Sequence, residues 1–225
     1  MSAKQDENSS GASRPMTEGR GAPWPLWTGL AVLAVLWLGP LPAMSRTAFS
    51  AHMVLHLGVV ALAAPLLAIG LVQSGIRLDS AAHLRRWMVA SFVCEMVVVW
   101  GWHAPYLHEA AARNVGVFML QQVSFLIVGL SLWLLGFAAR AKAAVGAALI
   151  LFVLTLMHMT MLGTLLIFAP RLIYAPEFCL GAFGLQPLDD QRFGGILMAT
   201  WSGIVYLAAG IALGYRLLAE PRQGD

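Results

Sequence analysis

The sequence predicts an all-α, polytopic membrane helix bundle with about six transmembrane helices and both termini in the cytoplasm. Three observations lead to this fold class: the composition, the length of the apolar segments and the distribution of basic residues. Of the 225 residues, 59% are hydrophobic and only 11% are charged, and the mean hydropathy is +0.74. A soluble domain carries about 25% charged residues. The chain has too few charges to cover a water-facing surface, so we interpret it as an integral membrane protein.

Apolar segments follow one another along the chain, each close to the roughly 20 residues that cross a bilayer. The six segments span residues 24–44, 48–72, 88–105, 116–138, 143–169 and 193–217. Pro40 and Pro42 are expected to end the first segment and Pro105 the third, because proline lacks the N–H that continues a helix. The sequence thus predicts six membrane crossings joined by short loops.

The two ends of the chain differ in composition from these segments. Residues 1–22 are rich in Ser, Gly and charged side chains, which predicts a disordered cytoplasmic tail. Trp24 and Trp27 then resemble the aromatic anchors of a retained membrane helix. We therefore expect a six-helix transmembrane domain over residues 23–218 and a cytoplasmic C-terminal tail over residues 219–225.

Basic residues are distributed unevenly between the two sides of the predicted bundle. One side carries ten of them, namely Lys4, Arg14, Arg20, Arg77, Arg85, Arg86, Arg140, Lys142, Arg216 and Arg222. The other side carries four, namely Arg46, Arg113, Arg171 and Arg192. The positive-inside rule places the richer side, with both termini, in the cytoplasm. These residues are topology signals in a protein surrounded by membrane lipid, and they do not indicate a nucleic-acid partner.

With this topology, five of the six histidines fall in the outer half of the membrane. The second segment opens with A-H-M-V-L-H, the third closes with W-G-W-H-A-P-Y-L-H, and the fifth contains L-M-H-M-T-M. A lone histidine in a membrane helix usually packs by donating one hydrogen bond to a neighbouring helix. His52 and His56, however, are four residues apart, which is the spacing that lets one helix offer two nitrogens to one ion. Methionines flank the outer histidines, and mixed imidazole and thioether ligands favour copper, especially Cu(I).

The predicted metal ligands are His52, His56, His103 and His158, lining one cavity that opens outward. The predicted secondary groups are Met53, Met161, Asp190, Glu95 and His108. Since His52 and His158 differ in depth by roughly 10 Å at 1.5 Å per residue, we expect a stepped column of sites more than a single shell. Neutral imidazole is the metal-binding form, so copper affinity should fall as the pH drops through about 6.5.

Glu95 and the acidic pair Asp189–Asp190 each allow two interpretations. A charged group at a helix centre costs about 2.5–3.5 kcal/mol on insertion scales, so Glu95 should face the bundle interior. There it serves either as a hydrogen-bond partner or as a functional carboxylate. Asp189 and Asp190 precede the sixth segment, where a helix cap is the alternative to a metal role. The chain has no nucleotide-binding, nucleophile or zinc-protease motif, so we do not expect an enzyme.

Four blocks of the sequence, in order, resemble the CtaG family of bacterial cytochrome c oxidase assembly factors. The blocks are H-M-V-L-H-L with A-A-P-L-L, W-H-A-P-Y-L, M-L-G-T-L-L-I-F-A-P-R-L-I-Y and D-D-Q-R-F-G-G-I-L-M, within residues 48–210. His52 and His56 match the family's H-M-x-x-H, Trp102 and His103 its W-H-x-P, and Asp190 and Gln191 its D-Q-x-x-G-G. Many members carry histidines early in the fourth segment, where Gln122 stands in this chain.

The resemblance implies a multi-span protein of the bacterial inner membrane that matures a haem–copper oxidase. Its expected partners are oxidase subunits or other copper chaperones, met on the periplasmic side. Three other functions remain open at this point. A membrane cytochrome would bind haem between two histidines at matched depth, such as His56 and His158. A copper or proton transporter would use Glu95 in its pathway, and a scaffold would hold oxidase subunits without binding metal.

Overall fold

The computed structural model describes residues 23–75 and 81–219, and every regular element in these ranges is helical. The α-helices are α1 (Trp24–Leu38), α2 (Leu41–Met44), α3 (Phe49–Gly58), α4 (Ala64–Gln73), α5 (Ala81–His103), α6 (Pro105–Arg113), α7 (Val115–Ala138), α8 (Lys142–Ile167) and α9 (Pro187–Ala219). A π-helical turn, η1 (Val59–Ala63), joins α3 to α4, and a 3₁₀ turn, η2 (Pro176–Phe178), precedes α9. The all-α prediction is confirmed. The predicted N-terminal tail and all but the first residue of the predicted C-terminal tail lie outside the described residues.

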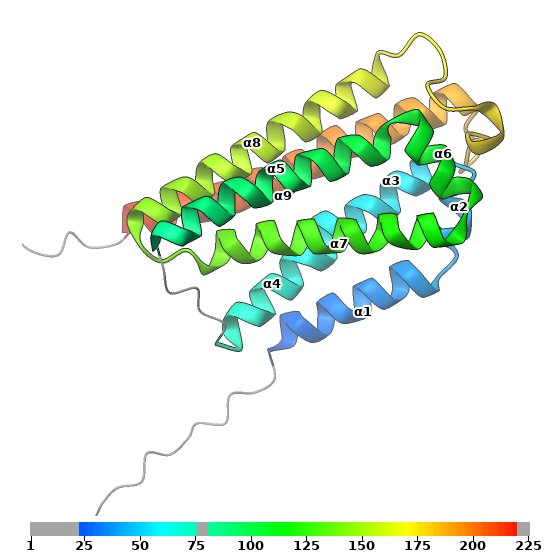
Figure 1. Cartoon of the computed structure of the whole chain (residues 1–225). Coiled ribbons are helices and arrows are strands. Elements are labelled where there is room, and N and C mark those ends of the chain that lie inside the picture. The colour runs from blue at the N-terminus through cyan, green and yellow to red at the C-terminus, as the bar shows by residue number, and fades with distance from the viewer. Residues whose placement is uncertain (1–22, 76–80, 220–225) are drawn as a thin grey trace, which may run out of the picture.

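The long helices run side by side along one axis (Figure 1). The start of α1 and the end of α9 lie at one end of this bundle, and α2, α6 and the loop between α8 and α9 lie at the other (Figure 1). We refer to the second end as the α2–α6 end. The two described chain ends therefore lie at the same end of the bundle, as they would after an even number of membrane crossings.

Four helical stretches are long and apolar enough to cross a membrane: Phe49–Gln73, Val115–Ala138, Lys142–Ile167 and Pro187–Ala219. Residues 83–103 of α5 and the helix α6, bent by 71° at the break between them, make a fifth if the pair is one span. α1 is apolar but has 15 residues, fewer than the roughly 20 that a crossing requires. The described chain therefore has four or five candidate spans where the sequence predicts six.

Element boundaries follow the prolines closely. α5 ends at His103, the backbone of Ala104 is extended, and Pro105 begins α6, as expected because the residue before proline avoids the helical region. The sequence analysis missed α6, whose residues it treated as a connection. It also placed the start of the third segment at 88 and of the sixth at 193, whereas α5 starts at Ala81 and α9 at Pro187.

The π-helical turn explains how the second segment stays continuous despite Pro65. A proline ring clashes with the carbonyl four residues earlier, here that of Ala61, and cannot donate to it. The wider π-turn over Val59–Ala63 absorbs this break in the hydrogen-bond ladder. It also leaves the Val60 carbonyl oxygen to accept a 2.8 Å hydrogen bond from Trp133 Nε1 of α7.

Glycines let α3, α8 and α9 approach closely. A Cβ atom on Gly163 of α8 would lie 2.7 Å from the carbonyl oxygen of Gly195 of α9, and the reverse distance is also 2.7 Å. A Cβ atom on Gly194 would lie 2.5 Å from the ring of Phe49 and 3.1 Å from Cγ of Met53, both on α3. Small residues at such contacts are the usual means of close helix packing in membranes. This packing brings together three helices that carry predicted site residues.

Candidate metal-binding site

Four histidines meet near the α2–α6 end and form what we call the histidine cluster. His52 and His56 come from α3, His103 ends α5, and His108 comes from α6, which turns back at the break after α5. The ring centroids are 4.8 Å apart for His52 and His108, 5.3 Å for His56 and His103, and 5.4 Å for His52 and His103. All four side chains are buried, with at most 4% of their surface exposed.

Most nitrogens of the histidine cluster have no hydrogen-bond partner. The unpaired buried atoms are His52 Nε2, His56 Nδ1, His56 Nε2, His103 Nε2 and His108 Nδ1. His103 Nδ1 lies 2.6 Å from the carbonyl oxygen of Val99. Because a carbonyl only accepts, Nδ1 carries the hydrogen and Nε2 presents a lone pair. Each unsatisfied buried polar group costs about 1–3 kcal/mol, which bonds to a ligand or to water would recover.

The spacing of the rings fits coordination of a common ion. Two imidazoles bound to one metal at about 2.0–2.1 Å have ring centroids about 5 Å apart, close to the three shorter separations. As the side chains stand, no group of three or more His, Cys, Asp or Glu residues in the described ranges has the geometry to hold a metal ion. Rotation about the Cβ–Cγ bond, a soft torsion in histidine, redirects the nitrogens while the centroids move little. The separations from His103 to His52 and to His56 thus suit ligands of one ion, whereas the rings of His52 and His56 lie 6.3 Å apart.

His158 lies apart from the histidine cluster and pairs with Glu95. The distance from His158 Nε2 to Glu95 Oε2 is 2.7 Å, and the two side chains are 5% and 0% exposed. The prediction that Glu95 faces the bundle interior is confirmed. Its second oxygen, Oε1, and His158 Nδ1 have no hydrogen-bond partner. The four predicted ligands are therefore split between two places, and His108, predicted as a secondary group, lies beside three of them.

Asp190 organises the start of α3. Its Oδ2 accepts hydrogen bonds from the backbone N–H groups of Phe49 and Ser50 at 2.8 and 3.2 Å. Its Oδ1 accepts from the hydroxyl of Ser50 and, at 3.1 Å, from the backbone N–H of Ala182. A helix N-terminus has free N–H groups and a positive partial charge, so a carboxylate stabilises it. Asp190 is thus a cap, but it caps a different helix from the one that carries it.

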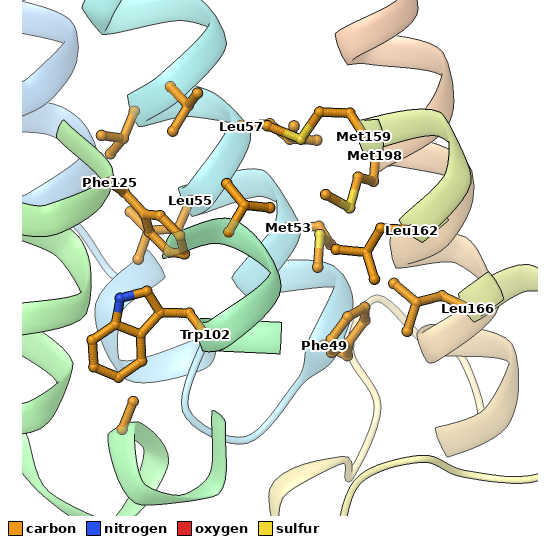
Figure 2. Close-up of a cluster of buried hydrophobic side chains, with 14 of the residues drawn as sticks. Phe49, Met53, Leu55, Leu57, Trp102, Phe125, Met159, Leu162, Leu166 and Met198 are labelled. Atoms are coloured by element: carbon orange, nitrogen blue, oxygen red, sulfur yellow. The ribbon is translucent and has the colours of Figure 1, made fainter. Parts of the chain in front are cut away.

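Two of the predicted methionines lie in very different surroundings. Met53 is fully buried in the same apolar cluster as Met159 and Met198. Figure 2 shows these three side chains, from α3, α8 and α9, in the same part of the buried core. Met161 is 57% exposed and lies outside this group. Met198 was not singled out from the sequence because α9 carries no histidine.

The wall of the histidine cluster on the α7 side is an aromatic ring. The centroid of Phe125 is 4.1 Å from that of His56. Gln122 is buried and donates to the neighbouring side chain of Gln121 at 3.3 Å. α7 therefore contributes an apolar surface next to the cluster in place of further imidazoles.

An opening and a thiol lie on the loop side of the site. His103 borders a cavity of about 210 Å³ that is also lined by Trp100, Leu162 and Tyr174. Burial raises the pKa of the Cys179 thiol to about 11, and Cys179 Sγ donates to the carbonyl oxygen of Pro187 at 3.7 Å. In the metal-free protein the thiol stays protonated at neutral pH, so a ligand role for Cys179 would require its deprotonation.

Comparison with known proteins agrees with the sequence motifs. The profile of one family, described as cytochrome c oxidase caa3 assembly factor (Caa3_CtaG), matches residues 9–220. No curated protein and no solved structure matches the chain. The family match covers the four sequence blocks, the histidine cluster and the Asp190 cap. The chain therefore belongs to the cytochrome c oxidase caa3 assembly factor family.

Proposed function

We propose that this protein binds copper at the histidine cluster and passes it on during assembly of a haem–copper oxidase. The observation that carries the copper role is the group of five buried imidazole nitrogens without partners. Family membership supplies the connection to oxidase assembly and implies a non-catalytic role. His52, His56 and His103 are the proposed ligands, with His108 as a fourth.

The ligand chemistry favours copper over other metals. Magnesium and calcium prefer carboxylate and carbonyl oxygens. The buried carboxylates of the described chain are Glu95 and Asp190. Glu95 is paired with His158, and Asp190 caps α3. An all-imidazole site beside a thioether, that of Met53, suits Cu(I), a soft ion.

The proposed orientation places the histidine cluster on the periplasmic side. The ten-to-four asymmetry of basic residues puts the α2–α6 end outside, and the cavity beside His103 is the proposed path for copper. Reporter fusions at residues 110 and 180 should have periplasmic activity, and a fusion at residue 80 cytoplasmic activity. The opposite result would turn the cluster toward the cytoplasm and remove the proposed route to oxidase subunits.

Metal analysis of the detergent-purified protein tests the proposed function. We expect bound copper in the wild-type protein and a lower copper content in the His52→Ala/His56→Ala variant. His83→Ala is the matched control, since His83 lies near the start of α5, 20 residues before His103, and should retain the metal. Wild-type protein that binds no copper, or a double variant that binds it normally, contradicts the proposal. A Soret band would instead assign haem, and ion flux in proteoliposomes a transporter.

A further inference from the structure

Three methionines converge in the interior next to the histidine cluster. Met53, Met159 and Met198 are all 0% exposed and belong to one buried apolar cluster. They come from three different helices and lie in the same part of the core (Figure 2). Of the other methionines of the described chain, Met88 packs in a second apolar cluster, Met119, Met157 and Met161 are more than half exposed, and Met44 and Met96 are partly buried. The convergence is therefore a local feature of the place where α3, α8 and α9 meet.

The packing of the three helices holds this group in place. Gly194 lets Phe49 and Met53 lie directly against α9, and Gly163 and Gly195 bring α8 and α9 together. Met198 lies one turn beyond Gly194 on α9, and Met159 one turn before Gly163 on α8. Both methionines thus sit next to the closest contacts of their helices. Thioether side chains are unbranched and polarizable, so three of them can turn their sulfur atoms toward a shared ion.

The methionine group is also continuous with the proposed copper ligands. Met53 follows His52 directly on α3 and precedes His56 by three residues, so its side chain leaves the same helical turn. Residues three apart on a helix are neighbours. An ion held by His56 therefore needs to move only across one face of α3 to reach the Met53 sulfur. Neutral thioether ligands select Cu(I) and related soft cations over Zn²⁺ and harder ions.

We propose that Met53, Met159 and Met198 form a second, thioether site for Cu(I), to which the histidine cluster passes the ion. This inference rests on the proposed copper role and adds a second copper-binding site to it. The transfer exchanges imidazole nitrogens for thioether sulfurs around the same ion. It involves no redox step, because copper remains Cu(I) throughout.

Cu(I) titration of the full-length protein against a chromophoric chelator tests the inference. We expect two Cu(I) per chain in the wild-type protein and one in the Met53→Leu/Met159→Leu/Met198→Leu variant. Leucine conserves volume and apolar character, so the fold should be retained. A Met88→Leu/Met161→Leu variant is the matched control and should bind two. The His52→Ala/His56→Ala variant should bind one Cu(I) through sulfur, with sulfur neighbours in its copper X-ray absorption spectrum.

The possible failures are distinct. If the triple methionine variant binds as many Cu(I) as the wild type, or if the histidine variant binds none while the wild type binds one, the thioether site is wrong and the histidine site stands. If the wild type binds no Cu(I), both proposals fail. A residual site in the histidine variant that lacks sulfur neighbours also contradicts the inference.

Discussion

The histidine cluster and the Asp190 cap are both buried and both touch α3, but their polar atoms are satisfied to opposite extents. Asp190 accepts hydrogen bonds from Phe49, Ser50 and Ala182. The histidine cluster leaves five nitrogens without a partner. A buried polar group whose hydrogen bonds are all made stabilises one structure, whereas a buried polar group without partners can still bond to a ligand. Within one turn of α3, the chain thus places a structural site next to the proposed binding site.

Phe49 connects the two regions. Its backbone N–H is held by Asp190, and its ring lies 5.5 Å from that of His108 and stacks on Tyr174 at 4.8 Å. The cap therefore fixes the aromatic wall of the histidine cluster and the position of His52 one turn further along α3. The difference between the sites predicts that loss of the cap harms folding, whereas loss of the histidines harms binding.

Replacing Asp190 with alanine is the change with the largest expected effect. It leaves the first N–H groups of α3 without an acceptor in a buried place, and the loss of such charge-assisted bonds costs about 3–5 kcal/mol. We expect the folded protein to be lost or its thermal unfolding temperature in detergent to fall strongly. The neighbouring Asp189, whose side chain is 61% exposed, provides the control, and Asp189→Ala should unfold like the wild type. Normal stability of Asp190→Ala would show that the cap is not structural.

Replacing His56 with phenylalanine should instead preserve the stability of the protein and weaken copper binding. Neither His56 nitrogen has a hydrogen-bond partner, so an apolar ring of similar shape removes unsatisfied groups from the interior. We expect the metal-free variant to be as stable as the wild type or more stable by about 1 kcal/mol, and Cu(I) affinity to drop at least about tenfold. Thermal unfolding with and without Cu(I) measures both effects. A variant that is destabilised and still binds copper would show that His56 serves stability and not binding.

The Glu95–His158 pair is intermediate between the two regions, because one bond is made and two atoms are left open. Glu95→Gln preserves an oxygen that accepts from His158 but removes the ionisable group. We expect the variant to fold normally and to fail in oxidase maturation, since glutamine cannot ionise to balance a bound cation. Copper content of the oxidase in a strain that carries the variant measures this. Normal copper content would assign Glu95 a structural hydrogen bond alone.

The smallest effect is expected at Cys179. Burial raises the pKa of its thiol to about 11, so the thiolate that binds copper appears only when the pH rises toward that value. Between pH 6 and pH 8, Cys179→Ser should change Cu(I) affinity by less than about twofold. Competition titrations of the wild type and the variant across this range measure the change. A large loss of affinity in the serine variant would make the thiol a ligand.

Periodicity and spacing predicted the parts of the site that depend on one helix. His52 and His56 share a face because they are four residues apart on α3, and Glu95 faces inward because lipid excludes it. The companions of these residues depend on contacts between helices, which no local pattern encodes. The 71° bend between α5 and α6 is what brings His108 beside His52, and the pairing of Glu95 with His158 joins residues 63 positions apart.

The number of crossings was harder to predict than the helices themselves. Each predicted apolar segment overlaps one of the long helices, but α1 stops at Leu38 and is followed only by the four residues of α2. Hydropathy registers apolar residues on both sides of a break such as Gly39–Pro40, and it counted them as one crossing. The same limitation hid α6, where a short polar helix follows the apolar end of α5.

Anomalous diffraction at the copper edge, on crystals of the Cu(I)-loaded protein, tests the central claim most directly. The account predicts a copper peak within about 2.0–2.1 Å of imidazole nitrogens of His52, His56 and His103, near the α2–α6 end of the bundle. The peak should disappear from that position in the His52→Ala/His56→Ala variant. A loaded crystal with no copper among these histidines, or with the same peak after both are replaced, would contradict the claim that the histidine cluster is a copper site.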